Sequence, residues 1–299
     1  MHAVVRTCCA AILLAACDTN TPVQPETVEA EPQEARILTL GEAVNGSWRS
    51  DAEKSRDAWR NPTETLEFFD LKPSDTVVEI WPGGGWYTNI LAPYLASGGG
   101  KLIAAHWDLE NAAADRGVRL EEVINRYKET YSDTEVYGTI ELSAFSAQSA
   151  EFAAPNSVDA VLTFRNVHNW MAGDYTTKFF DDAFAALKPG GTLGIVEHRL
   201  PSSQEQEPRA ASGYVHEDYV TSVAQRAGFE LVDSSEINAN PSDSADHPFG
   251  VWTLPPVSRT QDSEGNQPEG FDAQYYLQIG ESDRMTLKFV KPAPAIDAD

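Results

Sequence analysis

The feature that most limits the fold of this chain is a repeated alternation of short apolar segments with amphipathic helices. The apolar segments predict strands at residues 76–80, 101–106, 135–142, 157–164, 192–197, 229–237 and 284–290. The main helices are expected at residues 62–70, around 90–95, and at 109–130, 174–187 and 214–227. Repeated strand–helix units predict an α/β fold: a doubly wound, Rossmann-like, mainly parallel seven-stranded sheet with helices on both faces. Ligands of such sheets bind beyond the carboxyl ends of the strands.

The cysteines separate the N-terminus from the rest of the chain, because all three lie within the first 17 residues. This excludes a disulfide framework or a cysteine metal site in the body. An apolar run at residues 8–16 follows Arg6 and is too short to span a bilayer, which is typical of a signal peptide. The run ends in LAAC at Cys17 and resembles the lipobox of bacterial lipoproteins. The alternatives are an ordinary cleavage site or a buried N-terminal segment with an incidental cysteine.

The lipobox resemblance implies a signal peptide at residues 1–16, which is removed, and a lipid on Cys17. The protein would then be held on a bacterial membrane, facing the periplasm, through this anchor alone. Residues 17–35 are polar and proline-containing and predict a flexible tether that reaches roughly 20–25 Å. No later stretch is apolar enough to cross a membrane.

The remaining chain divides into a cap, a main domain and a tail. Residues 36–75 predict an N-terminal helical cap in which Asn61 caps the helix that begins at Pro62. The main domain spans residues 76–292, with a polar insertion at about 238–280 that is expected to be loop. Residues 293–299 form the tail. The 46 acidic and 22 basic side chains give a net charge of −24, which argues against nucleic acid as a partner.

A glycine-rich turn follows the first predicted strand, in the sequence VVEIWPGGGWYT at residues 77–88. Glycines between a buried strand and a helix let a ligand approach the backbone, and the start of the helix offers free N–H groups. A tight structural turn is the alternative interpretation.

The order of motifs along the chain resembles that of class I S-adenosylmethionine-dependent methyltransferases. Glu79 matches the acidic residue of their first motif, Gly83 and Gly85 match its later glycines, and Trp81 stands in place of its first glycine. Further similar segments follow at residues 158–162, 187–193, 227–232 and 288–292. The turn itself is similar to that of predicted exported methyltransferases that carry WPGGGWYT.

This resemblance implies S-adenosylmethionine as the cofactor. The carried-over cofactor-binding positions are Glu79, Trp81, Pro82, Gly83, Gly84, Gly85, Tyr87, His106, Asp108 and Gln148. His106 stands where the family has its ribose-binding carboxylate, with Asp108 two residues on. Gln148 is the polar candidate near the adenine. No spacing typical of metal ligands occurs, so no metal is expected.

The segment after the fourth predicted strand holds the candidate catalytic residues Arg165, Asn166 and His168. In the resembled fold this segment faces the substrate. His168 would remove a proton from the methyl acceptor, and Arg165 would hold an anionic group of a small-molecule substrate. The alternative is a structural histidine beside a surface tryptophan, Trp170. Arg56 and Arg60 predict either a lid helix or an amphipathic cap.

Three functions remain open from the sequence. The favoured one is methyl transfer to a small-molecule or envelope substrate. The second is a non-catalytic ligand-binding or envelope-associated lipoprotein on a methyltransferase scaffold. The third is a nicotinamide-dependent oxidoreductase, which is disfavoured because the turn lacks a G-x-G-x-x-G spacing.

Overall fold

A seven-stranded sheet forms the centre of residues 36–293, the part of the chain that this computed structural model describes. Its strand order is β3-β2-β1-β4-β5-β8-β6. The strands are β1 (Thr76–Ile80), β2 (Lys101–Trp107), β3 (Ile140–Phe145), β4 (Val158–Phe164), β5 (Leu187–His198), β6 (Glu230–Ser235) and β8 (Arg284–Val290). Only β8 runs antiparallel to its neighbours β5 and β6. The predicted α/β fold is confirmed.

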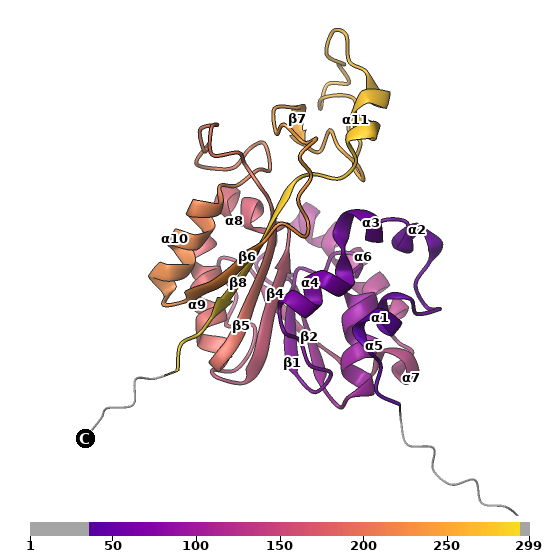
Figure 1. The fold of residues 1–299 in the computed structure, drawn as a ribbon, viewed down its shortest axis with the longest axis vertical. Coiled ribbons are helices and arrows are strands. Elements are labelled where there is room, and N and C mark those ends of the chain that lie inside the picture. The colour runs from indigo at the N-terminus through magenta and orange to yellow at the C-terminus, as the bar shows by residue number, and fades with distance from the viewer. Residues whose placement is uncertain (1–35, 294–299) are drawn as a thin grey trace, which may run out of the picture. The chain divides into compact units, whose positions relative to one another are not determined.

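Helices cover both faces of the sheet (Figure 1). One face carries α8 (Val167–Gly173), α9 (Thr176–Ala186) and α10 (Glu217–Ala227). The other carries α1 (Leu40–Val44), α4 (Pro62–Phe68), α5 (Thr88–Ser97), α6 (Ala114–Thr130) and α7 (Thr134–Tyr137). The short helices α2 (Asp51–Lys54) and α3 (Asp57–Arg60) lie between α1 and α4 in the sequence.

The two-residue period of the strands explains this layering. In β1, Val78 and Ile80 pack with the core beneath α8, α9 and α10, whereas Val77 packs with the core beneath α1, α4 and α5. Side chains of successive strand residues point to opposite faces, so a fully apolar strand must be covered on both. Glu79 shares the side of Val77 and is therefore buried toward α5.

The sheet order reverses between β1 and β4, because β1 pairs with β2 on one side and with β4 on the other. The connections that leave these two strands go to opposite faces, which opens a crevice at their carboxyl ends. The glycine-rich turn follows β1 at this crevice, and Arg165 follows β4. The sheet therefore places the two predicted site segments opposite each other.

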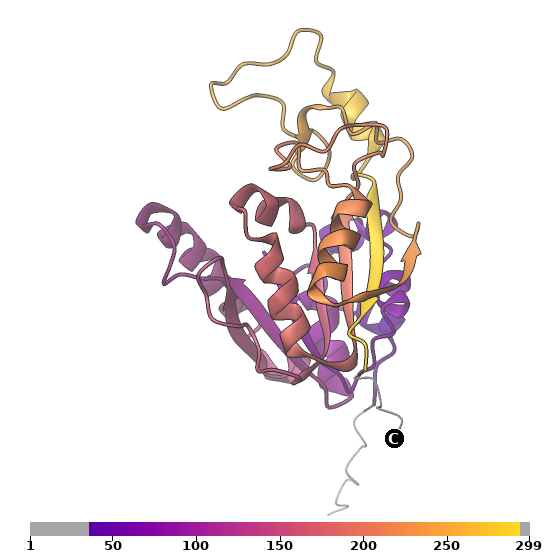
Figure 2. The same ribbon diagram turned by 90° about the vertical axis from the view of Figure 1, so that its left-hand side faces the viewer.

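The insertion between β6 and β8 lies at the same edge of the sheet. Since β6 ends there and the antiparallel β8 begins there, residues 236–283 must project from the carboxyl edge, as Figures 1 and 2 show. The prediction of loop throughout is wrong in part, because the segment contains β7 (Pro248–Val251) and α11 (Ala273–Ile279). Asp272 caps α11 by accepting the backbone N–H of Gln274.

Two predicted element boundaries are also wrong. The third strand was expected at residues 135–142, but this stretch begins with α7, because Asp133 accepts the backbone N–H of Glu135 as a helix cap. The preceding helix was expected from residue 109 but begins at Ala114. Asp108 holds the chain in a turn by accepting the backbone N–H of Glu110.

Asn61 begins α4 in a different way from the one predicted. Its backbone is left-handed, with φ of 38°, and its side chain makes no cap bond to the helix. The amide nitrogen instead donates to the carbonyl oxygen of Ile237, 2.7 Å away. Asn61 thus joins the N-terminal helices to the chain after β6. No helix within residues 36–293 is long and apolar enough to cross a membrane.

Candidate functional site

The glycines of the turn after β1 have different structural roles. Gly83 and Gly85 have positive φ values of 62° and 88°. A Cβ atom on Gly83 or Gly84 would meet nothing within 4 Å, whereas a Cβ on Gly85 would overlap the phenol of Tyr131. Gly85 therefore permits close packing, and the first two glycines leave open space above the backbone.

A cavity of about 400 Å³ lies at this turn, lined by Gly83, Gly84 and residues from β4 and the N-terminal helices. This volume falls within the range of ~300–1,000 Å³ that is usual for small-molecule sites. Among the described backbone hydrogen bonds, none uses the N–H of Gly83 or Gly84. The turn therefore presents free donors to a ligand oxygen.

Glu79 lies beneath the turn and is almost fully buried. Its carboxyl accepts the hydroxyl of Thr88, the first residue of α5, at 2.6 Å. Burial raises the pKa of Glu79 to about 7, although the Thr88 bond and the charge of Arg165 oppose the shift. Glu79 thus supports the start of α5, while its contact with a cofactor stays a prediction.

Trp81, which stands in place of the first motif glycine, has a left-handed backbone with φ of 48°. The indole Nε1 donates to the carbonyl oxygen of Phe145 at 3.0 Å, and the ring packs against Trp107 and Trp170. Trp81 and Trp107 line both the 400 Å³ cavity and a neighbouring one of about 180 Å³. The crevice is thereby divided into two aromatic-walled parts.

Of the residues predicted to hold the nucleoside, Asp108 and Gln148 line this second part and His106 does not. The ring of His106 is buried edge-on against Tyr127, and burial lowers its pKa to about 4. Neither ring nitrogen has a partner within residues 36–293. The carboxylate of Asp108 accepts the side chains of Asn111 and Ser146 at 2.6 and 2.9 Å. It is thus committed to its own turn.

Gln148 is exposed and lines both the 180 Å³ cavity and another of about 470 Å³. His106 lines only the larger of these two, whereas Asp108 lines both. The structure therefore brings Asp108 and Gln148 together and leaves His106 apart from the cavity at the glycine turn. Ribose binding by His106 and Asp108 stays a prediction.

Tyr87 and Trp170 belong to the core, and of the two only Tyr87 lines the cavity at the glycine turn. Tyr87 stacks on Phe164 with ring centroids 3.5 Å apart and lines the 400 Å³ cavity. Trp170 is fully buried and packs against Phe179. The interpretation of Trp170 as a surface residue is wrong, because α8 turns it inward beneath β1 and β4.

The segment after β4 brings the predicted catalytic residues to the crevice. Arg165 has a positive φ of 63°, and its side chain lines two cavities. The amide nitrogen of Asn166 donates to the carbonyl oxygen of Ile80 at 3.0 Å and to the hydroxyl of Thr163 at 3.2 Å. Asn166 therefore ties the ends of β1 and β4 together and acts as a positioning residue.

His168 forms a buried pair with Glu197, the next-to-last residue of β5. Its Nδ1 lies 3.0 Å from a carboxylate oxygen of Glu197. This carboxylate also accepts the backbone N–H groups of Val167 at 2.5 Å and His198 at 2.8 Å. Since the carboxylate is the acceptor, we assign the proton of neutral His168 to Nδ1. Nε2 is then an acceptor, and the Asn169 amide donates to it at 3.0 Å.

His198 completes a cluster with this pair. Burial and the neighbouring His168 lower the pKa of His198 well below its usual value, and its Nδ1 lies 2.6 Å from the Ser282 hydroxyl. Ligand atoms of His168, Glu197 and His198 lie within 4.8 Å of one another, a spacing that a metal ion could use. The three hydrogen bonds that Glu197 accepts are sufficient to explain why these three side chains lie close together.

Sequence reasoning missed a group of charges around Glu281. Its carboxylate pairs with Arg56 at 2.7 Å, with Arg60 at 3.0 Å and with Arg284. Although burial acts in the opposite direction, Arg284 and Arg60 lower the pKa of Glu281 to about 2. These residues and Arg165 line a cavity of about 350 Å³ together with His168. Arg56, Arg60 and Arg165 also line the cavity at the glycine turn.

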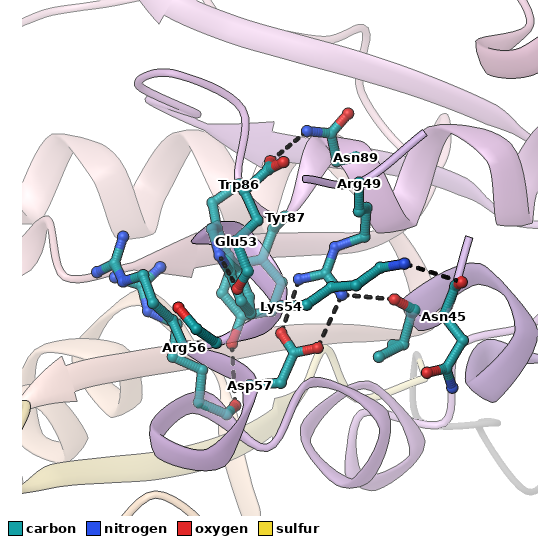
Figure 3. Close-up of polar contacts among 12 residues, drawn as sticks. Asn45, Arg49, Glu53, Lys54, Arg56, Asp57, Trp86, Tyr87 and Asn89 are labelled. Atoms are coloured by element: carbon teal, nitrogen blue, oxygen red, sulfur yellow. Dashed lines mark hydrogen bonds and ion pairs between the residues drawn. The ribbon is translucent and has the colours of Figure 1, made fainter. Parts of the chain in front are cut away.

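The N-terminal helices are docked directly onto the glycine turn and α5 (Figure 3). The indole of Trp86 donates to the backbone carbonyl of Glu53 at 3.2 Å, and Asn89 pairs with the Glu53 carboxylate. Arg49 forms a two-pronged pair with Asp57, with bonds of 2.7 and 2.9 Å. The cap thus brings Arg56 and Arg60 to the crevice.

Neither a protein-family model nor a curated protein matches this chain. Solved structures do match. A structure of the Haloferax volcanii methyltransferase activator Trm112 with its candidate methyltransferase aligns with a TM-score of 0.50 and 14% identity, over 81% of this chain and 93% of that one. A SAM-dependent methyltransferase from Aquifex aeolicus gives 0.46 and 19%, over 62% and 87%. The [4+2]-cyclase SpnF gives 0.49 and 14%, over 84% and 85%.

At sequence identities this low, structural similarity shows the fold alone. The reaction has to be inferred from the residues of the site. The strand order, the reversal at β1 and β4 and the antiparallel β8 are observed directly. The chain therefore has a Rossmann-like α/β fold, which it shares with the solved structure that contains the Haloferax volcanii candidate methyltransferase.

Proposed function

We propose that this protein transfers a methyl group from S-adenosylmethionine to a small-molecule acceptor. The observation that carries the proposal is the meeting of two cavities at Arg165. One lies at the open glycine turn, and the other holds the His168–Glu197 pair. A donor site and an acceptor site with a base are what methyl transfer requires.

The residues at the glycine turn fit the amino-acid end of this cofactor. Gly83 and Gly84 offer unused N–H groups and open space at the turn. The aromatic faces of Trp81 and Trp107 would lie near a sulfonium, which such faces attract. Asp108 and Gln148 would lie at the nucleoside end. When bound, the cofactor supplies an electrophilic methyl group on sulfur, and the sulfur keeps the electron pair of the broken bond.

The second cavity supplies the proton acceptor. An acceptor hydroxyl or amine placed near His168 would pass its proton to Nε2 as its lone pair forms the new bond to carbon. Glu197, held by two backbone N–H groups, would keep the ring oriented and stabilise the imidazolium that results. Asn169 would have to release Nε2 when the acceptor binds.

Calorimetric titration of the purified protein with S-adenosylmethionine and S-adenosylhomocysteine tests the proposal. We expect both to bind in the micromolar range. No binding of either at millimolar concentration would contradict the proposed function. Tight binding of NAD instead would favour an oxidoreductase, and cofactor binding without turnover on any acceptor would favour a non-catalytic binding protein.

We further propose that the protein is a lipoprotein on the periplasmic face of a bacterial membrane. The support is the sequence around Cys17, which lies outside the described residues. S-adenosylmethionine is made in the cytoplasm, so an exported methyltransferase needs a supply of cofactor outside it. This requirement makes the titration above the first experiment to perform.

A further inference from the structure

Four arginines line the 350 Å³ cavity that holds His168. They are Arg56, Arg60, Arg165 and Arg284, and the only carboxylate among the lining residues is Glu281. Arg60 and Arg284 are each only 2% exposed. The five side chains together carry three excess positive charges, in a chain whose net charge is −24. This local excess of positive charge requires an explanation, because like charges repel each other strongly when buried.

The hydrogen bonds of the group are incomplete. Glu281 is shared by Arg56, Arg60 and Arg284, while the Arg165 side chain makes no hydrogen bond or ion pair to any residue from 36 to 293. Across the same residues, Nη2 of Arg56, Nη1 of Arg60 and Nε of Arg284 are buried without a partner. Although each of these three arginines pairs with Glu281, a buried donor without a hydrogen bond is unfavourable, so the three unused donors favour binding of an anion.

Burial and mutual repulsion both act on the pKa values of these arginines. Burial and the charge of Arg165 lower the pKa of Arg60 to about 8, and burial and the charge of Arg284 lower the pKa of Arg165 to about 10. Of the two histidines that line the cavity, His198 adds no positive charge near neutral pH because burial and the neighbouring His168 lower its pKa. A bound anion would relieve this repulsion.

We propose that this cavity binds a dianionic oxyanion group of the methyl acceptor, as found in a phosphate monoester or a pair of carboxylates. The planar guanidinium of arginine donates two parallel hydrogen bonds to such groups. A group with two negative charges balances the three excess positive charges of the cavity more closely than a group with one negative charge. The assignment to the acceptor rests on the proposed function, whereas the anion site itself does not.

The residues on the remaining wall of the cavity indicate the chemical character of the rest of the acceptor molecule. The end of β7 and the chain that follows it contribute Val251, Trp252, Leu254, Pro255, Pro256 and Val257. Trp252 also packs edge-on against His168, with ring centroids 6.0 Å apart. The acceptor would therefore combine an apolar body, held by this wall, with the dianionic group, and present its nucleophile to His168.

Thermal unfolding of the full chain with inorganic phosphate, malonate or acetate, at constant ionic strength, tests the proposal. We expect saturable stabilisation by phosphate and malonate, and at least tenfold weaker binding of acetate. The phosphate effect should persist when S-adenosylhomocysteine saturates its site, because ligands at separate sites stabilise independently. Absence of saturable phosphate binding would overturn the proposal, and so would competition with S-adenosylhomocysteine, since the arginines would then hold the cofactor.

Arg165→Gln is the decisive variant, because its side chain has no native bond within the described part of the chain to lose. We expect phosphate affinity to fall at least tenfold, which is about 1.4 kcal/mol, while the ligand-free variant unfolds at the same temperature as the parent or higher. Arg226→Gln, exposed on α10, is the matched control and should bind phosphate normally. Unchanged phosphate affinity in Arg165→Gln would contradict the site.

These measurements separate the two proposals. Phosphate binding without S-adenosylhomocysteine binding would refute methyl transfer and leave the anion site standing. S-adenosylhomocysteine binding without phosphate binding would do the reverse.

Discussion

His168 shows how a single residue acquires a defined chemical state from its neighbours. Three N–H groups converge on the Glu197 carboxylate, one of them from the imidazole itself. This leaves Nε2 as the atom able to accept a proton in the 350 Å³ cavity. A histidine fixed in this tautomer is suited to act as a general base.

His168→Ala should therefore lower kcat by roughly 10²–10⁴-fold, the usual contribution of a general base, and leave cofactor affinity unchanged. Steady-state kinetics and calorimetric titration measure the two effects. His216→Ala is the matched control, because His216 contacts the Gln204 carbonyl away from both cavities. Equal kcat values for the His168→Ala variant and the parent would remove His168 from the mechanism.

Glu79 predicts a pH dependence of stability. Its pKa is raised from 4.5 to about 7 by burial, so the folded protein holds the proton more tightly than the unfolded chain. The stabilising contribution is complete below pH 4.5 and is lost as the pH rises to about 7, by about 3 kcal/mol at most. Glu79→Gln should remove this loss.

Urea unfolding of the ligand-free protein at a series of pH values checks this prediction. The stability of Glu79→Gln relative to the parent should rise between pH 4.5 and 7 and then become constant. Glu121→Gln, on the exposed side of α6, controls for the loss of a carboxylate. A constant difference between Glu79→Gln and the parent across this range would contradict the raised pKa.

At the scale of elements, the turn between β1 and α5 combines a packing glycine with ligand-facing ones. Gly85→Ala forces a Cβ into the Tyr131 phenol at a φ of 88°. We expect it to lower the free energy of unfolding by about 2–4 kcal/mol, from overlap and backbone strain together. Chemical denaturation measures the loss.

Gly84→Ala is the informative comparison, because its φ is not positive and its Cβ would point into open space. We expect stability within about 0.5 kcal/mol of the parent and a roughly tenfold loss of S-adenosylmethionine affinity, since the added methyl narrows the cavity. Unchanged cofactor affinity in this variant would show that the ligand does not approach the turn.

The predicted elements succeeded where apolar periodicity decides the structure and failed where single polar groups decide it. The strands at Val158–Phe164 and Arg284–Val290 follow from their apolar runs. Val136 and Tyr137 also have strand-forming side chains, but the Asp133 cap makes them part of α7. Similarly, Asn61 was expected to cap its own helix, yet it bonds to Ile237, which no local pattern indicates.

At the scale of the whole molecule, the chain combines a strongly acidic net charge with one locally positive cavity. The net charge of −24 is a sum over the whole sequence, and it led to the expectation that nucleic acid is not a partner. The structure shows a concentrated positive cavity within that acidic molecule. The net charge therefore gave no warning of the anion site.

Mass spectrometry of membrane fractions tests the predicted lipid anchor. We expect an N-terminal fragment that begins at Cys17 and carries a diacylglyceryl group. Cys17→Ser should abolish the modification, because sulfur is the acylated atom, whereas Cys9→Ser in the leader should not. A protein in soluble fractions that retains Met1 would contradict both the anchor and the removal of the leader.

The sequence by itself determined the sheet, the glycine turn and the position of Arg165 and His168 after β4. Each follows from local sequence patterns, because residues close together in the sequence determine where strands and turns begin and end. Only the tertiary structure decided that Glu197 would orient His168. It alone joined Arg56 and Arg60 to Glu281 and Arg284, which lie more than 220 positions away. Such contacts arise when the cap docks and the insertion returns to β8, and no periodicity in the chain records them.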